Sequence, residues 1–191
     1  MSSDWSSDVC SSDLLFDRSD GLPIMFHGNN SAFKRADGTM LFGGIGGFYS
    51  FHPDSVKIND QVPEIVITDF RLFNESVHAS GKGKGEMNKA ISYADSVELK
   101  YDQNDISFEF AALDYTEPGK NRYAYILENY QGQWIETDAG NRVATYTNLT
   151  PGTYVFRVRG SNNHGLWNME GTSLTILVHP PWWKTTIAYA L

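Results

Sequence analysis

The sequence lacks the residues and spacings that disulfides and metal sites require. Its single cysteine, Cys10, excludes an intrachain disulfide and any cysteine-based zinc site. The five histidines are scattered without the short spacings typical of metal ligands, and each is expected at a turn or on the surface: His27, His52, His78, His164 and His179. We therefore expect neither a metal ion nor a cofactor.

Positive charge is also scarce. The chain carries 15 basic and 23 acidic residues, for a net charge of -8. Because proteins that bind nucleic acid normally present a basic surface, nucleic acid is not an expected partner. No basic segment followed by an apolar run begins the chain, so no signal peptide is expected in it. Hydrophobic residues make up 41% of the sequence, which is enough for a buried core.

Helical periodicity is missing as well, and the patterns that are present are those of short strands. Tyr123, Tyr125 and Leu127 alternate with smaller or polar residues, so an extended backbone places two phenol rings and a leucine on one face. A turn at residues 129–132 then leads to Trp134 and to a strand that folds back. Strands at regular spacing, separated by Gly, Pro and Asn turns, predict an all-β antiparallel sandwich.

The strand faces that carry the large aromatic and aliphatic side chains define the expected core. Tyr154 follows a Pro-Gly turn and is expected to act as a tyrosine corner. In the strand predicted over residues 64–73, a break in the alternation near Asp69 indicates a bulge. The predicted aromatic core consists of Phe108, Phe110, Tyr123, Tyr125, Trp134, Tyr154 and Phe156.

The N-terminal part differs in composition from the rest. Residues 1–14 repeat Ser-Ser-Asp three times, resemble translated sequencing-adapter sequence, and are expected to be a non-native or disordered leader. In residues 15–60, tight turns at Asp37-Gly38 and Gly46-Gly47 separate three short strands. Such a meander is the unit of a β-propeller blade. Residues 61–179 then form the predicted sandwich domain.

The last twelve residues change character again. Trp182, Trp183 and Lys184 follow two prolines and precede an apolar run, a pattern typical of a membrane interface where a spanning helix begins. Only seven residues follow Lys184, whereas a spanning helix needs about 20. Residues 180–191 are therefore interpreted as a juxtamembrane segment, and an ordinary C-terminal strand and tail is the alternative.

Motifs for nucleotide binding or catalysis are not found. The glycines at positions 43, 44, 46 and 47 lack the spacing of a dinucleotide-binding loop, and residues 81–86 lack the Ser or Thr of a P-loop and are expected at a hairpin tip. The spacing of the carboxylates fixes no pair for glycoside hydrolysis. These are Glu109, Asp114, Glu117, Glu128 and Glu136, and we name no catalytic residue.

An ordered set of motifs resembles a known family. Residues 121–134, Leu149 to Tyr154, Gly165-Leu-Trp-Asn and the closing Pro-Pro-Trp-Trp-Lys-Thr are similar to the triple-tyrosine (Y_Y_Y) domain of two-component regulators and hybrid sensor histidine kinases. The third tyrosine of that pattern maps to Tyr130 or Tyr154. The resemblance implies an immunoglobulin or fibronectin III-like sandwich, placed after a propeller whose final repeat resembles residues 20–53.

The same resemblance implies a function. The chain would be a non-catalytic periplasmic relay in an inner-membrane receptor that forms a homodimer, linking its own propeller, a sensor of glycan fragments, to a membrane helix and a cytoplasmic histidine kinase. The alternative is a carbohydrate-binding module whose exposed rings contact sugars. The rings considered for that role are Tyr130, Trp134, Tyr146 and Trp167.

Overall fold

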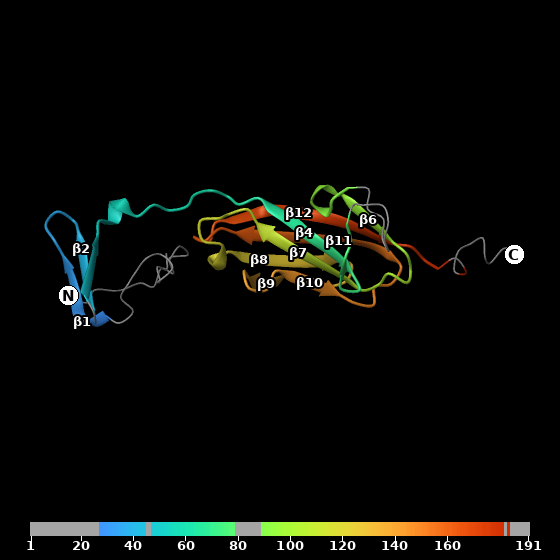
Figure 1. The fold of residues 1–191 in the computed structure, drawn as a ribbon, viewed down its shortest axis with the longest axis horizontal. Helices are drawn as coiled ribbons and strands as arrows, with labels where there is room; N and C mark the ends of the chain where they lie inside the picture. Colours follow the sequence, from blue (N-terminus) through green and yellow to red (C-terminus); the bar gives the residue numbers. More distant parts are fainter. Residues whose placement is uncertain (1–26, 45–46, 79–88, 182, 184–191) are drawn as a thin grey trace, which may run out of the picture. The chain divides into compact units, whose positions relative to one another are not determined.

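The computed structural model describes residues 27–44, 47–78, 89–181 and 183 (Figure 1). The chain divides into two compact units, residues 1–59 and 60–191. The predicted leader at residues 1–14, the predicted hairpin tip at residues 81–86, and Trp182 and Lys184 lie outside the described residues.

The first unit contains a three-stranded antiparallel meander. Its strands are β1 (His27–Lys34), β2 (Met40–Gly44) and β3 (Gly47–Phe51), followed by a short 3-10 turn at Pro53–Ser55. Gly38 has a φ of 91°, and the Asp37 carboxylate accepts a hydrogen bond from the Thr39 amide at 2.9 Å. The predicted turn at Asp37-Gly38 is therefore confirmed, whereas the interpretation of the meander as a propeller remnant stays a prediction.

The second unit is a sandwich of two sheets, and this confirms the predicted fold class (Figure 1). The four-stranded sheet has the order β10-β7-β4-β5, with β4 at Ile65–Leu72, β5 at Glu75–Ser76, β7 at Ile106–Ala112 and β10 at Val143–Tyr146. The five-stranded sheet has the order β6-β12-β11-β8-β9, with β6 at Ser96–Leu99, β8 at Arg122–Glu128, β9 at Ile135–Asp138, β11 at Gly152–Ser161 and β12 at Trp167–Val178. Short 3-10 turns occur at Ile91–Tyr93 and Pro118–Lys120.

One pairing departs from the antiparallel prediction. Strand β6 runs parallel to the end of β12, with Ser96 opposite Thr175 and Leu99 opposite Val178. The turn after β6 carries the chain to the other sheet, so β6 and β7 do not form a hairpin. The amide of His179 continues this pairing by donating to the carbonyl of Leu99 at 2.8 Å.

The bulge predicted near Asp69 is confirmed by a shift of register between Ile67 and Asp69 in the pairing of β4 with β7. The Asp69 carboxylate accepts hydrogen bonds from Arg71 Nε and Ser76 Oγ, both at 2.7 Å. Partial burial opposes the charge of Asp69, but these hydrogen bonds outweigh it and hold the pKa of the carboxyl below its usual value. The bulge is thus stabilised by polar contacts on the outside of the sheet.

Aromatic rings fill the space between the two sheets. The Phe108 ring lies 5.3 Å from the Phe70 ring and 4.5 Å from the Phe156 ring, measured between centroids, so stacked rings connect β4, β7 and β11. Ring pairs of this kind contribute about 1 kcal/mol each beyond the area that they bury. The core is therefore built from the faces that the alternation of the sequence singled out.

Candidate functional site

The predicted core tyrosines of β8 point between the sheets. Tyr123 is 2% exposed, and its hydroxyl accepts a hydrogen bond from the amide of Ala112 at 3.2 Å, which joins the two sheets. Tyr125 is half-buried, its ring packs 5.6 Å from that of Phe110, and burial raises the pKa of its hydroxyl. These phenols therefore do not form an open binding face.

Tyr154 occupies the tyrosine-corner position that the sequence predicts. Its side chain is 5% exposed, and its hydroxyl donates to the carbonyl oxygen of Thr150 at 2.9 Å. The hydrogen bond spans the turn that begins β11 and closes it onto the core. The prediction is confirmed, and the other predicted core rings, Phe108, Phe110 and Phe156, are completely buried.

Trp134 corrects the predicted core. Its side chain is 38% exposed, and it precedes β9 at the edge of the five-stranded sheet. The guanidinium carbon of Arg159 lies 4.2 Å from the centroid of its ring. The Arg159 side chain lies on the outer face of β11, because β11 buries the residues of the opposite parity. The indole therefore packs on a cation outside the sandwich, where the charge of Arg159 attracts its ring face.

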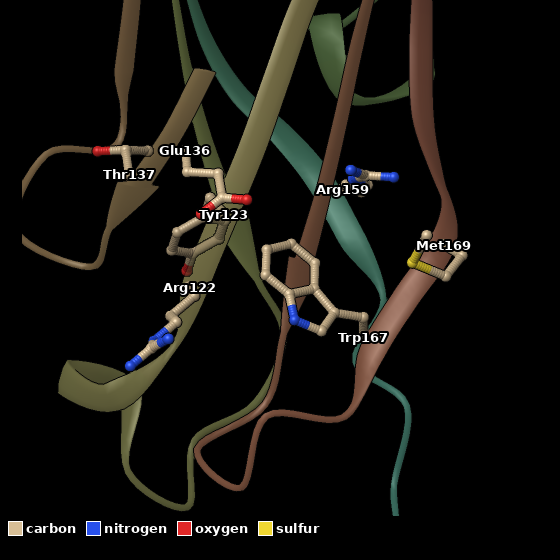
Figure 2. Close-up of a pocket in the computed structure, with 7 residues that line it drawn as sticks. All are labelled: Arg122, Tyr123, Glu136, Thr137, Arg159, Trp167 and Met169. Carbon is tan, nitrogen blue, oxygen red and sulfur yellow. The ribbon is translucent and has the colours of Figure 1, made fainter. Parts of the chain in front are cut away.

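A shallow hollow of about 390 Å³ lies on this outer face (Figure 2). Its lining comes from four neighbouring strands of the five-stranded sheet: Arg122, Tyr123, Glu136, Thr137, Arg159, Trp167 and Met169. Figure 2 shows the Trp167 indole between Arg122 and Glu136 on one side and Arg159 and Met169 on the other. Arg159 lies opposite Ala124 in the register, and Ala124 lies opposite Glu136, so a small residue separates two long polar ones.

The two cations of the hollow have no carboxylate partner among the described residues. Neither Arg122 nor Arg159 forms an ion pair with any residue that the structure describes. The buried Nε–H of Arg159 has no hydrogen-bond acceptor among those residues. Arg159 instead contacts ring faces, with Trp167 at 5.9 Å in addition to Trp134. No local pattern in the sequence indicates that Arg159 joins two tryptophans.

The four rings considered for sugar contact separate into two groups. Trp134 and Trp167 meet at Arg159, whereas Tyr130 packs edge-on against Tyr146 with 5.4 Å between ring centroids. Tyr146 is 3% exposed, and burial raises the pKa of its hydroxyl, so this ring offers no face to a ligand. Tyr130 is itself 47% exposed, but of these four rings Trp167 is the one that lines the hollow, and Trp134 adjoins it through Arg159.

A second feature that the sequence did not reveal is a clamp at the start of the sandwich. We define the clamp as the side chains of Asn162, Asn168 and Thr172 together with the backbone of residues 61–65 that they hold. Asn162 Nδ2 donates to the carbonyl of Gln61 at 3.0 Å, and Asn168 Nδ2 donates to that of Pro63 at 2.9 Å. The Thr172 hydroxyl donates to the carbonyl of Ile65. The N-terminal segment of the unit is thus fixed to β12 and to the turn before it.

The C-terminal end of β12 leads to the segment predicted at the membrane interface. Trp183 is 47% exposed, and its ring lies edge-on to Tyr101 with 5.1 Å between centroids. No helix in the part of the chain that the structure describes is long and apolar enough to cross a membrane. The interface role of Trp183 stays a prediction.

The carboxylates considered for catalysis do not gather into a pair. Glu109 binds Arg71 and Glu128 binds Arg157, each at 2.7 Å, and Glu117 binds Lys120 at 3.0 Å. The Asp114 carboxylate accepts a hydrogen bond from the Thr116 amide at 2.9 Å, and Glu136 lines the hollow. Within the described ranges, no cluster of His, Cys, Asp or Glu could hold a metal ion.

Comparison with known proteins finds similarity to a domain family, to a histidine kinase and to extracellular domains of two-component systems. The model of the Y_Y_Y domain family matches residues 114–179, which include the hollow and the β12 part of the clamp. Over 177 residues, the chain is 34% identical to a protein named histidine kinase P4 from Formosa agariphila. This alignment covers 93% of the chain but 13% of the kinase.

Solved structures from B. thetaiotaomicron are also similar to the chain. An extracellular domain described as that of the hybrid two component system BT3049 matches with a TM-score of 0.68 and 28% identity, covering 86% of the chain and 22% of that domain. The extracellular domain of BT4673 matches with a TM-score of 0.59 and 27% identity, covering 79% of the chain and 20% of that domain. The chain therefore spans a small part of each relative.

Proposed function

We infer that the chain, whose residues 114–179 are a Y_Y_Y domain, is a non-catalytic relay module in the extracellular part of a two-component receptor. Its likeness to extracellular domains of hybrid two-component systems supports this role. The finer proposal is that the module lies in the periplasm, as part of an inner-membrane receptor that acts as a homodimer.

In this proposal the relay connects two other parts of the receptor. A β-propeller, to which the meander of residues 27–51 belongs, detects a ligand such as a glycan fragment. A membrane helix that begins near Trp183 leads to a cytoplasmic histidine kinase. The name of the relative from Formosa agariphila supports a kinase in the full-length protein. The chain itself transmits the signal and carries out no chemistry.

The observation that carries the relay role is the path from the clamp to the exit of the sandwich. Asn168 and Thr172 lie on β12 and hold the carbonyls of Pro63 and Ile65. Past a bulge at residues 169–171, the same strand continues to Val178 and the Pro180-Pro181 exit. A fully extended strand of this length spans at most roughly 40 Å at about 3.3 Å per residue. One strand thus joins the segment where the chain enters the sandwich to the segment where it leaves.

Close packing makes this path stiff. The inner side chains of the lower part of β12, Leu174, Ile176 and Val178, are at most 1% exposed. Because interiors are packed about as densely as organic crystals, a displacement at the clamp shifts the strand and its sheet instead of being absorbed locally. A rigid element held at both ends is what a mechanical relay requires.

Replacing the sandwich in the full-length receptor tests this proposal. A variant in which a flexible Gly/Ser linker replaces residues 64–178, with both flanking segments kept, should reach the membrane but lose ligand-dependent kinase output. A receptor in which another rigid sandwich of similar length replaces these residues is the matched comparison. Unchanged ligand-dependent output with the flexible linker would refute the relay role.

A further inference from the structure

We propose that the hollow beside Trp134 and Trp167 is a binding site for an anionic saccharide, a pyranose that carries a carboxylate. This inference is independent of the relay role, because the hollow lies on the outer face of the five-stranded sheet and the clamp holds the edge of the sandwich through other side chains.

Two arginines in the hollow present positive charge to a ligand. Arg122 and Arg159 both line the hollow, and neither has a carboxylate partner in the described part of the chain. The next outward residue of β11, Arg157, shows the usual alternative, since it binds Glu128 at 2.7 Å. In a chain with a net charge of -8, two unpaired cations in one hollow form a local site for an anion.

Aromatic rings lie next to the Arg159 cation. Trp134 is 38% exposed, and Trp167 extends into the hollow (Figure 2). Sugar rings present a C–H face that packs on an indole, while an attached carboxylate pairs with a guanidinium. Arg159 contacts both tryptophans, so a single ligand can reach the indole and the charge together.

The size of the hollow and its remaining polar lining also fit a sugar. A volume of about 390 Å³ lies at the lower end of the range for small-ligand sites, which favours one or two sugar rings over a folded partner. Glu136 supplies carboxylate acceptors for sugar hydroxyl groups at the opposite side of the hollow.

The test is a titration of the full 191-residue chain with digalacturonate, with the neutral disaccharide α-1,4-galactobiose as the matched sugar and triglutamate as the matched peptide. Amide chemical shifts and tryptophan fluorescence report binding. We expect saturable binding of digalacturonate, at least tenfold weaker binding of galactobiose, and no binding of triglutamate. Equal binding of both sugars, saturable binding of triglutamate, or no binding of digalacturonate would overturn the proposal.

Variants locate the site. Arg159→Gln and Arg122→Gln should each weaken digalacturonate binding about tenfold, the effect of losing one charge-assisted hydrogen bond. Arg157→Gln changes the same residue type outside the hollow and should bind like the unmodified chain. Far-ultraviolet circular dichroism checks that each variant folds. If Arg159→Gln does not fold, the affinity of Arg122→Gln for digalacturonate is the test. Unchanged affinity in that variant would show that the hollow is not the binding site.

Discussion

At the scale of single residues, the aromatic side chains divide into those that brace the sandwich and those that face outward. Tyr123 and Tyr154 are buried, and their hydroxyls are hydrogen-bonded: that of Tyr123 to the amide of Ala112, and that of Tyr154 to the carbonyl and the hydroxyl of Thr150. Trp134 belongs to the second group, because the charge of Arg159 holds its ring outside the core. A buried phenol with a satisfied hydroxyl contributes stiffness, while an indole over a cation leaves a surface available for contact.

Tyr154→Phe tests the tyrosine corner. The substitution keeps the ring in the core but removes the hydroxyl that donates to Thr150 O, so the free energy of unfolding should fall by about 1 kcal/mol. Urea denaturation followed by fluorescence measures the change. The control is Tyr130→Phe, which removes a hydrogen bond to Thr147 O at an exposed site and should change stability by less than about 0.5 kcal/mol. Equal effects of the two substitutions would contradict a special role for the corner.

At the scale of elements, β12 depends on a bulge that brings the clamp into position. The register with β11 shifts between Val158 and Gly160, so that residues 169–171 protrude from the ladder. Gly171 has a φ of 61°, and a Cβ atom there would lie 2.1 Å from the carbonyl oxygen of Val158. Its amide donates to the Oδ1 of Asn168 at 2.9 Å, which orients the clamp residue. Glycine at this position therefore allows Asn168 to reach Pro63.

Gly171→Ala should destabilise the sandwich strongly. The added methyl group meets backbone and forces a left-handed conformation on a residue that disfavours it, so the free energy of unfolding should fall by about 3 kcal/mol or more. Urea denaturation measures the loss. Gly132→Ala is the matched control, because nothing lies within 4 Å of the added methyl group, and its effect should stay within about 0.5 kcal/mol. A small effect at position 171 would mean that the bulge can rearrange without cost.

The sequence predicted the elements whose signal is local. Alternation identified the strands around Phe108, Tyr123 and Phe156, and the break near Asp69 identified the bulge in β4. It did not predict the first half of β12, because Asn168 and Gly171 are typical turn residues, and only pairing with β11 keeps them in a strand. The parallel pairing of β6 was missed for the same reason: four residues carry no local information about their partner strand.

The candidate site shows the same limit. The sequence marked Trp134 and Trp167 as possible sugar contacts. Their meeting depends on the register among β8, β9, β11 and β12, which long-range hydrogen bonds set. Trp134 was predicted in the core because a large aromatic beside a strand is usually buried, and the cation that attracts it is 25 positions away in the sequence. Contacts of this kind follow from the tertiary fold alone.

At the scale of the whole sandwich, the clamp and the strand β12 connect the point where the chain enters the domain to the point where it leaves. Gln61 and Pro63 are held by Asn162 and Asn168, and the amide of His179 is held by the carbonyl of Leu99 at the other end of the same strand. If the domain transmits force, weakening the clamp must loosen the N-terminal segment while the core stays folded. That separation of effects distinguishes a coupling device from a general contribution to stability.

The substitution Asn168→Asp tests the coupling. Aspartate keeps the Oδ1 acceptor that serves Gly171 N but loses the donor to Pro63 O. Since a lost hydrogen bond is worth about 1 kcal/mol, hydrogen exchange in residues 61–67 should accelerate at least about fivefold, with exchange in residues 174–178 unchanged. In the full-length receptor, ligand-dependent kinase output should fall. Asn129→Asp removes the same kind of donor, to Thr153 O, away from the clamp, and should affect neither measurement. Normal output from a receptor whose residues 61–67 exchange rapidly would show that the signal does not pass through the clamp.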